Sequence, residues 1–112
     1  MAHYAAMLTG DVAALVGHLD QGILGRSISA NVEDSSDLRI GDARMVVRVY
    51  ERYSAMGGNR VSLNVSILAV DGQLAVSAIS SGGSQAVFWK VNTFGEEAFL
   101  RRAVQAIEAY RP

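Results

Sequence analysis

The sequence predicts an α+β domain, a two-layer sandwich in which an antiparallel meander of four to five strands carries an N-terminal and a C-terminal helix on one face. Apolar residues recur with helical spacing near both ends, whereas apolar and polar residues alternate in the segments between them. Turn-forming residues separate these segments. The 112 residues are enough for one domain with one core, and we assign 1–112 to it.

The first predicted helix covers residues 10–21. Its apolar residues share one face, at i, i+3, i+4 and i+7: Val12, Leu15, Val16 and Leu19. We expect Thr9 to cap this helix, and Gly22 and Gly25 to close it. The residues before it, including His3, are expected to form a loose terminus.

The strands follow. Ile28, Ala30 and Val32 alternate with polar residues, and residues 34–37 then predict a turn. Longer alternating segments run over 44–53 and 60–70, and a further strand starts at Leu74. Residues 56–59 and the Asp71-Gly72 dipeptide are typical hairpin turns, so these three strands form a meander.

The alternation also predicts which side chains leave the core. We expect the other face of the sheet, which carries no helix, to display mainly polar side chains, with two apolar ones among them. These residues are Ser29, Asn31, Val46, Arg48, Tyr50, Arg52, Ser62, Asn64, Ser66, Ser77 and Ile79.

The C-terminal part begins with a Ser- and Gly-rich segment, residues 80–85. Residues 86–91 predict a fifth strand, with an irregular packed segment as the alternative. A final helix follows, because Thr93 and Glu96 match a capping box. Its apolar stripe is Phe99, Ala103, Ala106, Ile107 and Tyr110.

Composition excludes several classes of function. The chain has no cysteine, which removes disulfides, thiol catalysis and thiolate metal sites. The formal net charge of −1 argues against nucleic acid or an anionic membrane as a partner. No apolar run approaches the ~18 residues of a membrane helix, and the start lacks a secretory leader, so we expect a cytoplasmic protein.

The helix-free sheet face is the first candidate site. Arg48, Tyr50 and Arg52 are predicted to project from one strand beside Ser62 and Asn64. Such a surface could bind an anion or meet its own copy across a two-fold axis. Alternatively, these residues are simply the solvated face of an antiparallel sheet.

The Ser- and Gly-rich segment is the second candidate site. Backbone N–H groups and hydroxyls of Gly82, Gly83, Ser84 and Gln85 could hold a phosphate or carboxylate. The alternative is a tight turn, since glycine pairs commonly mark turns and the lysine of a Walker loop is missing.

Catalytic and metal sites are not expected. Neither His3 nor His18 belongs to a nucleophile motif, and His18 is expected to satisfy carbonyls near the end of its helix. The acidic residues at 33, 34, 37 and 42 miss the spacing of a calcium loop. We therefore assign no catalytic residue, metal or cofactor.

Two stretches resemble a family of small bacterial proteins that is known only as a domain of unknown function. They are residues 50–60, with Tyr50-Glu-Arg-Tyr-Ser54 and Gly57-Gly-Asn-Arg60, and residues 76–99, from Val76-Ser-Ala-Ile to Gly95-Glu-Glu-Ala-Phe99. The family has no assigned activity, so the resemblance transfers no role. It directs attention to Asn59, Arg60, Gly82, Gly83, Gln85, Lys90 and Asn92.

These observations favour a non-enzymatic binding or interaction domain that forms a homodimer. The competing hypothesis is a small enzyme or anion-binding protein, with Arg60 and Lys90 beside the Ser-rich loop and Asn92 near them. A chaperone-like protein that binds another protein is the third hypothesis.

Overall fold

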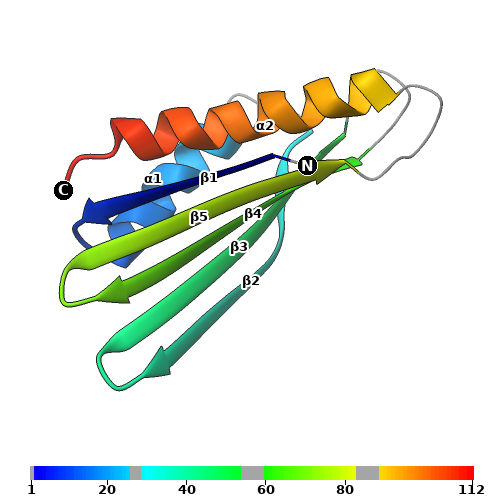
Figure 1. The fold of residues 1–112 in the computed structure, drawn as a ribbon. Helices are drawn as coiled ribbons and strands as arrows, with labels where there is room; N and C mark the ends of the chain where they lie inside the picture. Colours follow the sequence, from blue (N-terminus) through cyan, green and yellow to red (C-terminus); the bar gives the residue numbers. More distant parts are fainter. Residues whose placement is uncertain (1, 26–28, 54–59, 83–88) are drawn as a thin grey trace.

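Two helices lie on one face of a five-stranded antiparallel sheet in the computed structural model (Figure 1). The structure describes residues 2–25, 29–53, 60–82 and 89–112, with side chains of the last helix from residue 97 onward. In chain order the elements are β1 (Ala2–Thr9), α1 (Val12–Leu24), β2 (Asn31–Ile40), β3 (Ala43–Tyr53), β4 (Arg60–Val70), β5 (Gln73–Gly82) and α2 (Trp89–Ala109). The predicted α+β class is confirmed.

The sheet has the strand order β1-β5-β4-β3-β2. Strands β2 to β5 form the predicted meander, and β1 adds the fifth strand by pairing antiparallel with β5. The prediction of a loose N-terminus was therefore wrong, because His3 lies within β1. The predicted fifth strand over 86–91 was also wrong, since residues 89–91 belong to α2 and residues 86–88 lie outside the described part.

Helix α1 begins two residues later than expected. The carboxylate of Asp11 accepts a hydrogen bond of 2.9 Å from the N–H of Ala14, so Asp11 and not Thr9 is the N-cap. Gly10 has a φ of +136°, which turns the chain from β1 into the helix. At the other end Gly25 is the C-cap, while Gly22 lies inside the helix instead of closing it.

The acidic segment 34–37 lies in the middle of β2 and does not turn the chain. Its backbone pairs with β3, and the irregularity is a bulge between Val32 and Asp34. The chain turns at Gly41, which has a φ of +56°. Cross-strand pairing along the whole of β3 thus outweighs the turn preference of short polar residues. Of the strand expected from Ile28 to Val32, Val32 lies in β2, which begins at Asn31, whereas Ala30 precedes it and Ile28 lies outside the described part.

The two remaining hairpins agree with the sequence. Asp71 and Gly72 both have positive φ, of 52° and 77°, as the tight turn of a two-residue hairpin requires. Strands β3 and β4 pair antiparallel as expected, although their connection, residues 54–59, lies outside the described residues. The predicted capping box at Thr93 and Glu96 was wrong, because α2 begins at Trp89 and both residues are within it.

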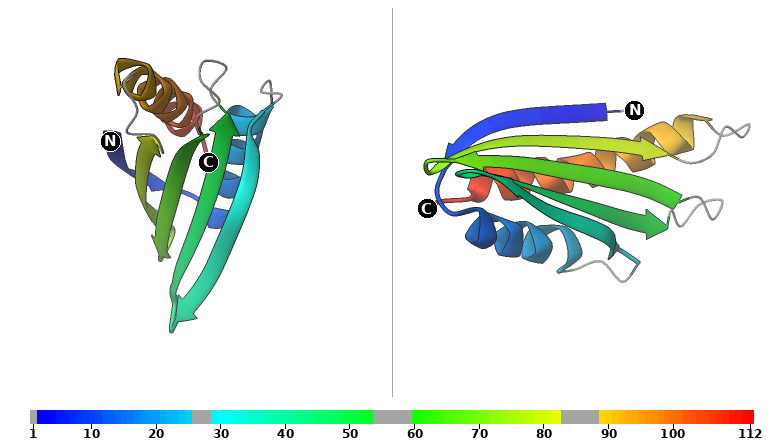
Figure 2. Two further views of the ribbon diagram at one scale, coloured as in Figure 1. Left: turned by 90° about the vertical axis from the view of Figure 1, so that its right-hand side faces the viewer. Right: turned by 90° about the horizontal axis from the view of Figure 1, so that it is seen from below.

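The core lies between the sheet and the two helices, whose arrangement Figure 2 shows from two further directions. Helix α1 contributes Val12, Leu15, Leu19 and Ile23. Helix α2 contributes the predicted stripe as far as Ile107 together with Leu100, Tyr110 of the stripe follows directly after the helix, and β4 contributes Val61, Leu63, Val65 and Ile67. Since both helices bury their apolar faces on the same side, the other sheet face carries neither of them.

The two helices also pack on each other. His18 Nε2 lies 2.7 Å from the carbonyl oxygen of Ala106, to which it donates, and the His18 ring meets the edge of Tyr110. At Gly22 a Cβ atom would lie 2.8 Å from the Cβ of Ala106. The absence of a side chain at Gly22 therefore sets how closely α1 approaches α2.

Two glycine-to-alanine substitutions in α1 test this contact. Gly17→Ala should raise the free energy of unfolding by about 1 kcal/mol, because nothing lies within 4 Å of its new methyl group and alanine favours a helix. Gly22→Ala gains the same helix propensity, but its overlap with Ala106 costs about 1–3 kcal/mol, so the net change should be zero or destabilising. Urea unfolding of both variants measures the difference. Equal stabilisation at both positions would contradict the close helix contact.

Candidate functional site

The sheet face that points away from both helices is the candidate site, and we call it the uncovered face. It is formed by the odd-numbered residues of β1, β3 and β5 and the even-numbered residues of β4. In β2 it includes the even-numbered residues after the bulge, and Asn31 before it. Residues opposite each other on neighbouring strands form rows that cross the sheet.

One of these rows is apolar on all five strands. It consists of Leu38, Met45, Leu68, Ala75 and Met7, in the order from β2 to β1. Among the side chains that the structure describes, the exposed large hydrophobic ones are Met7, Leu38, Ile40, Met45, Tyr53, Leu68 and Ile79, and all of them lie on the uncovered face. Met7 is 71% exposed and Ile40 is 85% exposed. Such concentration on one face is typical of an interaction surface.

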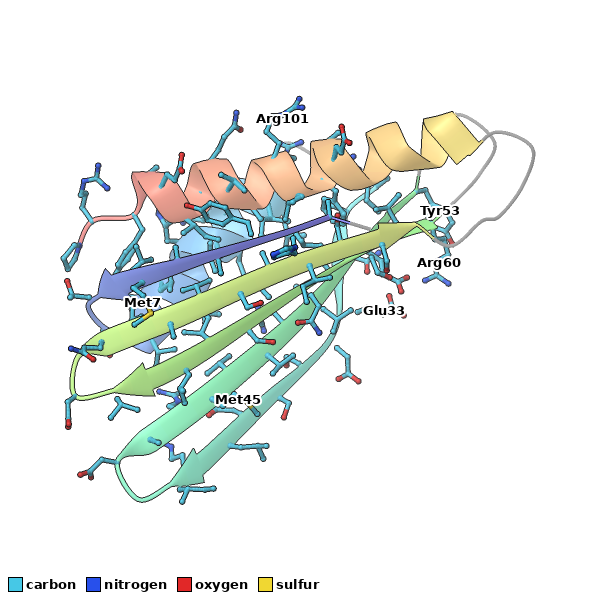
Figure 3. The ribbon with its side chains drawn as sticks, viewed as in Figure 1. Met7, Glu33, Met45, Tyr53, Arg60 and Arg101 are labelled. Carbon is cyan, nitrogen blue, oxygen red and sulfur yellow. The ribbon has the colours of Figure 1, made fainter. Side chains whose placement is uncertain are left out.

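A shallow groove of about 530 Å³ crosses the uncovered face on β1, β5 and β4. Its floor consists of small side chains, Ala5, Ser66, Ala75 and Ser77, and Met7, Met45 and Leu68 rise around them. Figure 3 labels Met7 and Met45, which come from β1 and β3, strands with two others between them in the sheet. None of the described residues that line the groove is ionisable. The groove is therefore shaped for an apolar side chain or ligand.

Charged residues gather at the other end of the uncovered face. Arg60 forms an ion pair with Glu51 and lies 3.7 Å from a carboxylate oxygen of Glu33. Its guanidinium group lies over the ring of Tyr53, 5.4 Å from the centroid. Ser62 donates a hydrogen bond of 3.4 Å to Glu51. Arg60, Glu33 and Tyr53 are labelled together in Figure 3. This cluster neutralises Arg60 locally instead of presenting it to an anion.

The predicted interaction face was wrong for β3. Arg48, Tyr50 and Arg52 lie on the side of the helices, because Tyr50 opposes the core residue Leu63 and is fully buried. Ser62 and Asn64 do lie on the uncovered face, so the two groups are on opposite sides of the sheet. The physical reason is that α1 offers a polar partner, Asp20, to the polar side chains of β3.

Asp20 joins α1 to β3. Arg48 forms an ion pair with its carboxylate through two nitrogens, of which Nε lies 3.3 Å from Oδ1. The hydroxyl of Tyr50 donates to the same oxygen at 2.7 Å. Burial, followed by the hydrogen bond to Asp20, raises the pKa of Tyr50 above its ordinary value. The cluster is a structural link, since each charged group in it already has a partner.

Arg52 also connects β3 to a helix, in this case α2. Its guanidinium group lies 4.8 Å from the ring centroid of Phe99 in α2. Burial, with a smaller effect from Arg102, lowers its pKa. A sequence pattern shows that these three β3 side chains share a face, but it does not say that the helices cover that face.

The second predicted site lies largely outside the described residues. Gly82 ends β5, but residues 83–85 are not described. Lys90 and Asn92 belong to the first turns of α2, of which only the backbone is described. Arg60 points to the uncovered face, whereas α2 lies on the opposite face. Within the described part, no group of three or more His, Asp or Glu side chains could hold a metal ion.

The chain belongs to the family of unknown function DUF6054, whose model matches residues 1–111. The resemblance expected from the second half of the sequence is thus confirmed and extends over almost the whole chain. No curated protein matches the sequence. A search of the described helices finds none that is long and apolar enough to cross a membrane.

The buried hydroxyl of Tyr50 should make the stability depend on pH in the alkaline range. Its pKa is raised in the folded state, so it stabilises the fold fully below pH ~10, the ordinary tyrosine value, and less as the pH rises towards its folded pKa. Above pH ~10 the free energy of unfolding should fall by up to about 1.4 kcal/mol per pH unit relative to Tyr50→Phe. Urea midpoints of both proteins between neutral and alkaline pH measure this. Parallel profiles would show that the hydroxyl is not buried.

Proposed function

We propose that this DUF6054 protein is a non-enzymatic interaction domain that works as a homodimer, with the uncovered faces of two copies packed against each other. The observation that carries the proposal is the distribution of exposed apolar side chains. In the described part of the chain, the large ones all lie on the uncovered face, and one row is apolar from edge to edge. A solvated sheet face would instead be polar.

The size of the uncovered face supports a stable dimer. Five strands spaced about 4.8 Å apart, with about 8–9 residues of about 3.3 Å each, cover roughly 700 Å². Two copies would bury roughly 1,400 Å² in total, which is within the usual range of specific interfaces. Packing sheets face to face, about 10 Å apart, is also a common way to complete a two-layer domain.

The chemistry of the uncovered face supports association more than catalysis. Among its described residues the groove has hydroxyls but no ionisable group, so these residues offer no general acid or base to a substrate. The charged groups nearest to it along the strands, Arg60 and Glu51, neutralise each other. The hydroxyl of Ser66 donates a hydrogen bond of 2.9 Å to the side-chain oxygen of Asn64. This polar pair in the middle of the face therefore keeps that hydrogen bond when water is excluded.

A charge in the middle of the uncovered face should dissociate the dimer. Leu68 lies on the central strand and in the apolar row, so Leu68→Arg would place two like charges at the centre of the interface. We expect a dimer mass for the unsubstituted protein and a monomer mass for Leu68→Arg, by light scattering and sedimentation over a range of concentrations.

Gln105→Arg is the matched control, because it adds the same charge at an exposed position of α2 on the helical side. It should remain a dimer, and circular dichroism should show that both variants are folded. A monomer mass for the unsubstituted protein up to high micromolar concentration would overturn the proposal. A dimer that persists in Leu68→Arg would place the contact elsewhere.

A further inference from the structure

We propose that the two copies are related by a two-fold axis that runs parallel to β4, between the two sheets, so that Met45 packs on the partner's Ala75. This inference rests on the proposed homodimer and adds its geometry. Leu68, on the central strand, would then lie next to the axis and meet the partner's Leu68. Each outer strand would lie over the opposite outer strand of the partner, β2 over β1.

A two-fold axis can take three simple directions relative to a sheet. An axis perpendicular to the sheet would join edge strands side by side, which leaves the exposed Met45 and Leu68 uncovered. The other two directions lie in the plane between two stacked sheets. One runs across the strands and stacks each strand on its own copy. The other runs along them and exchanges the two halves of the sheet.

The distribution of charge favours the axis along the strands. On the uncovered face the carboxylates of the described residues lie on one half of the sheet, in Glu33 and Asp34 of β2 and Glu51 of β3. An axis across the strands reverses their direction, so it would stack this acidic end of β2 and β3 on their apolar end, at Leu38 and Met45. An axis along β4 places it over β1 and β5 of the partner, which bear no acidic residue. The carboxylates thereby face neither the partner's carboxylates nor its Leu38 and Met45, and Arg60, which meets its own copy beside the axis, is neutralised by Glu51.

The rotation stacks the apolar row on the partner's apolar row in the opposite order of strands. Beside the axis, a large side chain then meets a small one. From β2 to β1 its members are Leu38, Met45, Leu68, Ala75 and Met7. Reversal about Leu68 sets Met45 opposite the partner's Ala75, a large side chain on a small one. Because Ala75 is on the floor of the groove, the partner's Met45 would enter the groove and fill space that is open in a single copy.

The next row repeats the same match. It consists of Ser36, Val47, Ser66, Ser77 and Ala5. Reversal sets Val47 opposite the partner's Ser77, which also lines the groove. Stacked sheets cross at about 30°, which displaces opposite residues least near the axis and most at the edges. The pairs on β3 and β5 are therefore the ones that test the arrangement.

Exchange of side-chain size between positions 45 and 75 gives a sharp test. Met45→Ala alone empties the groove, and Ala75→Met alone places methionine on methionine. Each should weaken the dimer by about tenfold or more. A mixture of the two variants should form a heterodimer that is within about threefold of the unsubstituted protein in affinity, because each interface contact again joins one methionine and one alanine. Sedimentation with one variant fluorescently labelled measures the three affinities.

The mixture excludes an effect within one chain, since neither copy carries both substitutions. The control is a mixture of Met7→Ala with Ala75→Met, which leaves methionine on methionine and should stay weak. If the unsubstituted protein is a dimer but the 45/75 mixture binds no more tightly than its components, the axis is overturned and the homodimer stands. If the unsubstituted protein is a monomer, both are overturned.

Chemical cross-linking provides a second readout that does not depend on affinity. The chain has no cysteine, so Met45→Cys and Ala75→Cys each carry one thiol. A short bismaleimide should link the mixture of these variants several-fold more than either variant alone. A disulfide is not the probe, because backbones of stacked sheets are about 10 Å apart and a disulfide needs Cα atoms within about 7 Å. Equal linking in the mixture and in the single variants would overturn the axis.

Discussion

The hydrogen bond between Tyr50 and Asp20 fixes which side chains of β3 lie on which face of the sheet. The rest of the arrangement depends on this choice of face. Side chains alternate along a strand, so a shift of one residue in β3 would exchange its faces completely. Burial of Tyr50 against α1 fixes that register, and β4 and β2 follow from it through their pairing with β3. The position of Met45 on the uncovered face is thus a consequence of a polar contact on the covered one.

This dependence explains how far the sequence could predict the fold. The helical stripes, the Asp71-Gly72 turn and the alternation in β4 are local patterns, and all of them hold in the structure. The faces of β3 are not a local property. Met45, Val47 and Val49 are more apolar than Arg48, Tyr50 and Arg52, so apolarity alone selects the wrong face. Only the position of Asp20 on α1, distant in sequence, reverses the choice.

The edges of the sheet were harder to predict for a related reason. An edge strand is paired on one side, so its sequence is under weaker constraint than that of a central strand. β1 contains three alanines and a histidine, and β2 contains the acidic residues 33, 34 and 37, none of which favours a strand. Pairing with β5 and β3 stabilises them instead. The apolar row that defines the candidate site could have been found only after the register of all five strands was known.

The β2–β3 hairpin connects the fold to the proposed dimer. In Figure 1 its turn extends away from both helices, so neither of its sides is packed on them there. On the helical side it has the ion pair of Arg44 with Asp37, whose hydrogen bond lowers the pKa of Asp37. Exposed ion pairs contribute little to stability, and an isolated two-stranded ribbon is marginal in water.

Leu38, Ile40 and Met45 lie on the other side of that hairpin, where a single copy leaves them exposed. In the proposed dimer the partner's β1 and β5 would cover this side and would provide the packing that the helices do not reach. The acidic residues of β2 then have a second effect. They disfavour the stacking of β2 on its own copy, so the same strand that needs a partner also restricts how the partner is oriented.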